Sequence, residues 1–215
     1  MSRSVNNNVR RKYQLKQRAK RQAETRQRIV EAAVSLHEAL GPARTTISAL
    51  ARKAGVQRLT VYRHFPREED IFTACGQHYL TQNPPPDPSS WPPVSDPEKR
   101  LRQALLEIYQ YHARTEQMMA SFYRDYPLKP ASLKATAPYI QHWQHLRDSL
   151  AQGFPLDDER RPLLLAALAH ALDFRTWQSL VRGQVLDNQQ AVELMAGMVL
   201  AVARPLPVGA DSLSP

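Results

Sequence analysis

The stretch TTISALARKAGVQRLTVYRHF, residues 45–65, decides the fold of the N-terminal part of the chain. Thr45 and Thr46 are residue types that favour the N-cap of a helix. Gly55 ends that helix, because glycine tolerates a positive φ. A second short helix follows and stops before Pro66, which cannot continue it. Two short helices joined by so tight a turn predict a helix-turn-helix.

The second of these helices has two different faces. Val61 and Phe65, spaced i and i+4, form an apolar inner face, and Val56 fills the angle between the two helices. The alternative is an ordinary helical hairpin with a solvated basic face. The outer face is polar and basic and consists of Arg58, Leu59, Tyr62 and Arg63, with Thr60 and His64 at its edges.

Positive charge is concentrated at the N-terminus. The chain of 215 residues has a formal net charge of +9, and residues 1–28 hold ten Lys or Arg against one acid. The rest of the chain is therefore neutral. We expect a basic, flexible arm over residues 1–24, which would attract a polyanion such as nucleic acid or an anionic membrane. The alternative is a solvated tail that only aids solubility.

Beyond the helix-turn-helix, the sequence predicts further helices and no strand. A proline-rich loop over residues 83–97 cannot be helical and divides the chain. The fold class is therefore all-α, with a flexible tail over residues 205–215. The expected helices after the loop cover residues 98–126, 131–153, 160–182 and 188–204.

Composition and missing motifs exclude several classes of protein. Cys75 is the one cysteine, so an internal disulfide is impossible, and no apolar run has the length of a signal peptide or membrane span. A cytoplasmic protein is expected. The glycines form no phosphate-binding loop and no hydrolase motif occurs, so neither an enzyme nor a cofactor is expected. His142 and His145 lack an acidic or thiol partner nearby, so no metal is expected either.

Residues 29–72 resemble the DNA-binding domain of TetR-family transcriptional repressors. The helix that ends at Gly41, the Thr-Thr helix start, ALARKAGV, TVYRHF and the acidic opening of the next helix all fall in register. The resemblance implies a DNA-binding domain over residues 25–72 and a helical regulatory and dimerisation domain over residues 73–204. It also implies a dimeric repressor that a small molecule releases from a pseudopalindromic double-stranded DNA operator.

The resemblance further implies roles for individual residues. Thr45 and Thr46 would meet phosphate, whereas Arg58, Leu59 and Thr60 would read base edges. Three positions depart from the family pattern: Gln57 replaces a frequent serine cap, Leu59 replaces a frequent glycine, and Arg67-Glu68 replaces a Ser-Lys pair. The expected DNA contacts are Thr45, Thr46, Arg58, Leu59, Thr60, Tyr62, Arg63, His64 and Arg67.

The C-terminal half would supply the dimer and the effector site. The apolar segments 160–182 and 188–204 are expected to form the dimer. The face expected from the latter consists of Ala191, Leu194, Met195, Met198 and Val202. An aromatic and methionine cluster suits an apolar or aromatic effector, although such a cluster can also be plain core. The rival function is non-specific DNA binding, as in a nucleoid-associated protein, or membrane association, through the arm alone. The expected effector-binding residues are Tyr109, His112, Met119, Phe122, Tyr123, Tyr139, His142, Trp143 and Trp177.

Overall fold

The computed structural model describes residues 2–93, 95–125, 132–154 and 158–204. All regular secondary structure in these ranges is helical, which confirms the all-α prediction. None of the helices in the described ranges is both long enough and apolar enough to cross a membrane. The chain forms two compact units: unit 1 comprises residues up to Asn83 with a segment from Ala120 to Thr136, and unit 2 comprises the remainder.

Unit 1 is built on the helix-turn-helix. Its elements are α1 (Ser2–Leu40), the 3-10 turn η1 (Pro42–Arg44), α2 (Ile47–Ala54), α3 (Arg58–His64) and α4 (Glu68–Gln82). α1 packs against both α2 and α4, and α2 packs against α3. Apolar side chains at i, i+3 and i+4 spacing make this packing possible. The buried core consists of Ile29, Val30, Ala32, Ala33, Leu50, Ala51, Ala54, Val61, Phe65, Ile71, Ala74 and Cys75.

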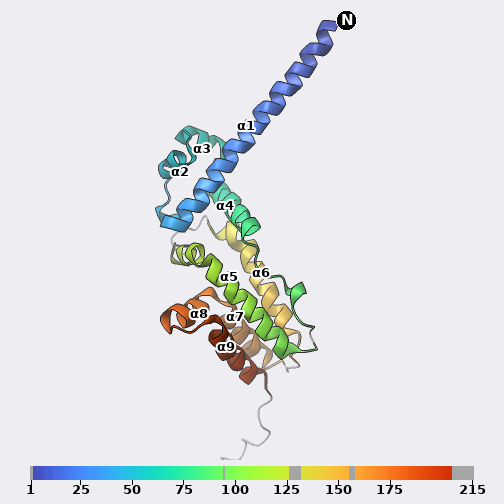
Figure 1. The fold of residues 1–215 in the computed structure, drawn as a ribbon, viewed down its shortest axis with the longest axis vertical. Helices are drawn as coiled ribbons and strands as arrows, with labels where there is room; N and C mark the ends of the chain where they lie inside the picture. Colours follow the sequence, from blue (N-terminus) through green and yellow to red (C-terminus); the bar gives the residue numbers. More distant parts are fainter. Residues whose placement is uncertain (1, 94, 126–131, 155–157, 205–215) are drawn as a thin grey trace, which may run out of the picture. The chain divides into compact units, whose positions relative to one another are not determined.

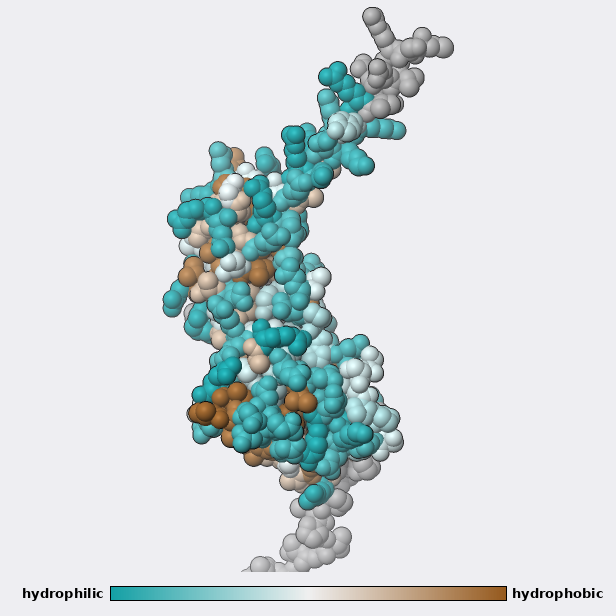
Figure 2. All heavy atoms as spheres, in the orientation of Figure 1, coloured by the Kyte–Doolittle hydropathy of each residue, from teal (hydrophilic) through white to brown (hydrophobic). Residues whose placement is uncertain are grey.

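Helix α1 is much longer than the core requires. It is 39 residues long and includes the segment for which a flexible arm was expected. Residues 10–28 are mostly Arg, Lys, Gln and Ala, which are strong helix formers, and the first glycine of the chain is Gly41. The sequence therefore contains no breaker before the core. Figure 1 shows α1 projecting past α2 and α3, and Figure 2 shows mainly hydrophilic side chains on the projecting part.

The last turn of α5 (Pro97–Asp125) belongs to unit 1 and is bonded to the end of α1. Asp125 Oδ2 accepts a hydrogen bond from the Ala43 amide at 2.9 Å, and the Ser121 hydroxyl donates to the Glu38 carbonyl at 3.2 Å. Gly41 lies between them with φ of +88°, a backbone conformation that favours glycine. The predicted helix end at Gly41 is therefore also the place where α5 is attached.

Unit 2 contains the rest of α5 and the helices that follow it, except that the start of α6, up to Thr136, belongs to unit 1. These are α6 (Ser132–Ala151), α7 (Arg161–Leu172), α8 (Phe174–Gln178), the π-helical turn η4 (Ser179–Gly183) and α9 (Asn188–Ala203). The proline-rich loop contains the 3-10 turn η2 (Pro88–Ser90). Trp91 fixes this loop to α5, because its Nε1 donates to Glu107 at 2.9 Å and its ring is buried.

The single helix expected over residues 160–182 is wrong, because the chain breaks at Asp173. Asp173 has an extended backbone, and its carboxylate caps α8 by accepting from the Arg175 amide at 2.6 Å. The break frees the last carbonyls of α7. The Tyr109 hydroxyl donates to the Ala171 carbonyl at 3.1 Å, and His112 Nε2 lies 3.0 Å from the Leu172 carbonyl. Two side chains of α5 thus satisfy the helix end.

Candidate nucleic-acid interface

The turn between α2 and α3 has the geometry that the sequence predicts. The Thr46 hydroxyl caps α2 by accepting from the Ala49 amide at 3.1 Å. Gly55 adopts the left-handed conformation, with φ of 65° and ψ of 40°. Val56 is half-buried against the core, and Gln57 makes no side-chain bond as the cap of α3. The α3 cap is therefore weaker than the α2 cap.

The two faces of α3 also follow the prediction. Val61 and Phe65 are buried in the core. Leu59 is 75% exposed and Tyr62 is 44% exposed, although both are large and largely apolar. The exposed arginines Arg58 and Arg63 lie on the same face of this seven-residue helix, so the face combines apolar and positively charged side chains. This face is therefore the candidate contact surface.

The edges of this face are less exposed than its centre. Thr60 and His64 are half-buried, whereas Arg58 and Arg63 are exposed. Burial, and after it the charges of Arg63 and Arg26, lower the pKa of the His64 imidazole. The neutral imidazole is thereby favoured in the free protein.

Two of the expected phosphate contacts are already engaged within the protein. The Thr45 hydroxyl donates to the Gly41 carbonyl at 2.9 Å, so its hydrogen is not free for a phosphate oxygen. Arg67 forms an ion pair with Asp70 at 2.7 Å, and this hydrogen bond raises the pKa of the guanidinium. Asp70 lies in the first turn of α4, and its carboxylate also accepts from the Arg67 backbone amide at 3.2 Å. Thr46 keeps its hydroxyl hydrogen available, since its oxygen acts as the acceptor in its cap bond.

Residues 29–75 match the family model described as bacterial regulatory proteins, tetR family. The match begins in α1 and ends in α4, so it covers the whole helix-turn-helix. Over these residues, the chain is a TetR-type DNA-binding domain. The resemblance expected from the sequence is thus confirmed. The match to the family model ends before unit 2, which begins at Pro84.

Two curated relatives each match 67 residues of the chain. The HTH-type transcriptional regulator SrpR of Pseudomonas putida is 42% identical over 67 residues, which are 30% of this chain and 32% of SrpR. The uncharacterized HTH-type transcriptional regulator TtgW, also of Pseudomonas putida, is 42% identical over 67 residues, which are 30% of this chain and 50% of TtgW. The chain thus spans between a third and a half of the relatives that it matches.

Solved structures extend the likeness in fold to more than four fifths of the chain. A TetR-like transcriptional regulator from Rhodococcus sp. RHA1 is 18% identical, with a TM-score of 0.57, covering 82% of this chain and 93% of its own. The multidrug binding protein EbrR complexed with imidazole is 19% identical, with a TM-score of 0.50, covering 86% and 92%. At such identities the likeness concerns the fold, which is a TetR-type domain followed by a helical domain.

The expected effector-binding residues fall in both units. Phe122 and Tyr123 belong to unit 1. In unit 2, aromatic rings gather around His112, with ring centroids at 5.4 Å for Trp143 and 6.0 Å for Trp177. Two members of this cluster are not among the residues that the sequence predicted for effector binding. They are Tyr111 and Phe174, whose ring centroids lie 6.1 Å and 5.6 Å from His112. The break before Phe174, which the sequence did not reveal, turns that ring toward His112.

Several polar atoms of this cluster are used by the fold itself. The Tyr139 hydroxyl donates to Met119 Sδ at 3.1 Å, and Trp177 Nε1 donates to Asn188 Oδ1 at 2.9 Å. The Tyr109 hydroxyl bonds to the end of α7, as described above. Burial raises the pKa of the Tyr109 hydroxyl and lowers the pKa of His142. These groups therefore hold the cluster together as neutral side chains.

Other polar atoms of the cluster are buried without a hydrogen-bond partner among the described residues. These atoms are the Tyr111 hydroxyl, His112 Nδ1, His142 Nε2 and Trp143 Nε1. A carbonyl oxygen only accepts, so His112 Nε2 carries the hydrogen that points to Leu172, and Nδ1 is an acceptor. Burial lowers the pKa of His112 to about 4, which keeps the ring neutral. Among these atoms, His112 Nδ1 is an acceptor and Trp143 Nε1 is a donor.

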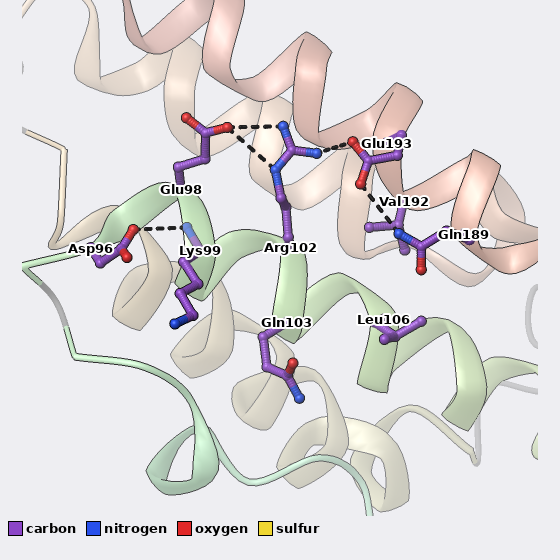
Figure 3. A pocket seen from close by; sticks show the side chains of 9 residues that line it. All are labelled: Asp96, Glu98, Lys99, Arg102, Gln103, Leu106, Gln189, Val192 and Glu193. Carbon is purple, nitrogen blue, oxygen red and sulfur yellow. Dashed lines mark hydrogen bonds and ion pairs between the residues drawn. The ribbon is translucent and has the colours of Figure 1, made fainter.

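A polar hollow in unit 2 is a weaker candidate for an effector site. It lies between the start of α5 and α9 and has a volume of about 510 Å³ (Figure 3). Arg102 donates to Glu98 at 2.9 Å and also pairs with Glu193. These three charges in the wall of the hollow therefore compensate one another. Within the described ranges, no group of three or more His, Cys, Asp or Glu side chains could hold a metal ion.

Proposed function

We propose that this protein is a sequence-specific DNA-binding transcriptional regulator, which represses as a dimer and is released by a small molecule. The observation that carries the proposal is the outer face of α3, where exposed Leu59 lies beside exposed Arg58 and Tyr62. The match of residues 29–75 to the TetR-family model supports the same function. Binding, rather than catalysis, is the activity that such a face provides.

The side chains on this face suit the major groove of DNA. An arginine grips the O6 and N7 atoms of guanine with two hydrogen bonds, and an apolar side chain packs on the methyl group of thymine. Arg58 lies at the first position of α3, where the helix end can approach base edges. We therefore assign Arg58 to a guanine and Leu59 to a thymine, with Tyr62 on the backbone.

Selection of binding sites from random DNA tests this function. The wild-type protein should enrich a pseudopalindromic site, and Arg58→Ala should weaken discrimination at one base pair in each half-site by about 1–3 kcal/mol. Arg58→Lys is the matched control, because it keeps the charge and loses the two-pronged geometry. It should bind mixed-sequence DNA like the wild type but lose the same preference. Failure of the wild-type protein to enrich any site would refute sequence-specific regulation.

The dimer is proposed from an exposed apolar stripe in unit 2. α7 and α9 pack together and bury Ala191 and Met195, which the sequence analysis had placed on the dimer face. Leu194 and Met198 remain 45% and 51% exposed, and Leu163 of α7 is 60% exposed. Along α9, the small residues at positions 197 and 201 are also exposed, which allows a second helix to approach closely. A second copy of these two helices would complete a four-helix bundle.

Light scattering tests the dimer directly. Met198→Glu combined with Leu194→Glu should convert a dimer into a monomer, because two charges would be desolvated in the interface. Ile140→Glu on α6 is the control, since Ile140 is similarly exposed at 43% but lies outside the stripe. A wild-type protein that stays monomeric at every concentration would contradict the proposal.

The effector is proposed to bind at His112 and Trp143. A compound that donates to His112 Nδ1 and accepts from Trp143 Nε1 would satisfy both buried atoms, and the surrounding rings favour an aromatic body. EbrR, which shares the fold, was solved with imidazole, a ring that carries one donor and one acceptor nitrogen. Calorimetry with phenol and imidazole tests the site. Each should bind the wild type, and toluene, which lacks polar atoms, should bind much more weakly; equal binding of all three would contradict it.

A further inference from the structure

The projecting part of α1 presents one polar face toward α3. Side chains spaced three or four residues apart along α1 share this face, among them Gln14, Arg18, Arg21, Thr25 and Arg28. The spacing follows the period of the helix, so these side chains form a continuous row over about 20 Å at about 1.5 Å per residue. Because residues 10–28 form part of one helix with the core, the row has a fixed direction.

This row and α3 together enclose an open groove of about 890 Å³. From α3, the groove receives Thr60, Arg63 and His64. Neither Asp nor Glu occurs among the described residues that line it. Arg26 holds α1 to α3, because its guanidinium carbon lies 4.8 Å from the centre of the Phe65 ring. The groove is therefore formed before any partner binds, and its charges are four arginines without a neighbouring carboxylate in its wall.

We propose that this groove binds the sugar-phosphate backbone of duplex DNA beside the base pairs that α3 reads. The inference rests on the proposed function, since α3 contributes both the reading face and one wall of the groove. Arginine, glutamine, threonine and tyrosine are side chains that donate to phosphate oxygens. Duplex DNA carries one charge per about 1.7 Å of its axis, so a row of this length can face several phosphates. Such contacts hold the duplex in register and carry no sequence information.

Charge complementarity alone would also suit an acidic protein or an anionic membrane. The shared helix favours DNA, because Arg63 lies in the groove while Arg58 lies at the start of the same short helix. A duplex that contacts Arg58 in its major groove would bring its adjacent backbone to Arg63 and on toward Arg21. A peptide or a lipid headgroup would not have to contact both the groove and the outer face of α3.

Paired charge-removal variants of the full chain test the groove. Arg18→Gln with Arg21→Gln removes two charges that line it, and Lys12→Gln with Lys16→Gln removes two charges from α1 residues that do not. Binding to a mixed-sequence duplex is measured over a range of salt concentrations. The arginine variant should reduce the slope of log affinity against log salt concentration by about 2 per bound protomer, and the lysine variant by much less. Circular dichroism should show equal helix content in all three proteins.

Three results would overturn the proposal for the groove. An unchanged slope for the arginine variant would mean that the groove does not contact phosphates. Equal changes of the slope for both variants would mean that α1 attracts DNA only through its overall charge. A loss of binding to phosphatidylserine vesicles or polyglutamate, with DNA binding unchanged, would assign the groove to another partner. Failure of the proposed function is seen in a separate experiment, as a lack of site enrichment from random DNA. The salt slope is measured on mixed-sequence DNA, so it tests the groove without a selected site.

Discussion

Acidification should destabilise unit 2 through His112. The ring is buried among aromatic side chains, and this burial lowers its pKa from the ordinary 6.5 to about 4. As the pH falls below 6.5, His112 therefore binds a proton in the unfolded chain but not in the native protein. The stability contributed by the neutral ring is complete above that pH and is lost progressively toward pH 4. Each pH unit in this window costs about 1.4 kcal/mol.

The expected loss over the whole window is thus roughly 3 kcal/mol, a large part of the stability of an ordinary domain. Urea unfolding monitored by tryptophan fluorescence measures it, because Trp91, Trp143 and Trp177 all lie in unit 2. The comparison is between the wild type and His112→Gln at each pH. His142, whose pKa burial also lowers, is present in both proteins, so its titration cancels in the difference.

The free energy of unfolding of the wild type should fall more steeply than that of His112→Gln between pH 6.5 and pH 4. A lower stability of the variant at pH 8 does not affect this comparison, because only the slopes are compared. Parallel lines for the two proteins would refute the reasoning, since they would mean that His112 takes up its proton equally in the folded and unfolded states.

Three further outcomes are expected. Gly41→Ala should lower the free energy of unfolding by about 1–3 kcal/mol, because a Cβ would collide with the Arg124 guanidinium and the Asp125 carboxylate at a φ of +88°; an unchanged melting temperature would contradict this. Leu59→Ala should relax preference at one A·T pair in the selected site by about 1 kcal/mol while keeping α3 folded, and an unaltered selected sequence would remove Leu59 from the reading face. Burial raises the pKa of the Cys75 thiol to about 12, so iodoacetamide should label it far more slowly in the native protein than in urea, as mass spectrometry would show; equal labelling rates would contradict its burial.

The local features of the TetR-type domain could be predicted from the sequence. The left-handed conformation of Gly55, the cap made by Thr46 and the buried pair Val61 and Phe65 each depend on residues within four positions of one another. Caps, breakers and helical periodicity are strong signals over such distances. The same signals predicted the all-α class.

The features that were missed depend on distant residues or on the lack of a breaker. The segment around Asp173 contains no glycine or proline, and its break is stabilised by Tyr109 and His112, about sixty residues away. The charge of the first 24 residues suggested a flexible arm, although their composition favours a helix. The apolar face of α9 was predicted, but the sequence does not show that α7 covers Met195 and leaves Met198 exposed.

The attachment of α5 to the end of α1 limits how such a protein can be recombined. A chimera that exchanges the DNA-binding head between two regulators could be cut at the loop after α4. Here a head ending at Asn83 would lose the partners that Asp125 and Ser121 provide to Ala43 and Glu38. A grafted head would therefore need a matching last turn of α5 from the same parent, so that the head is transferred as two pieces of chain.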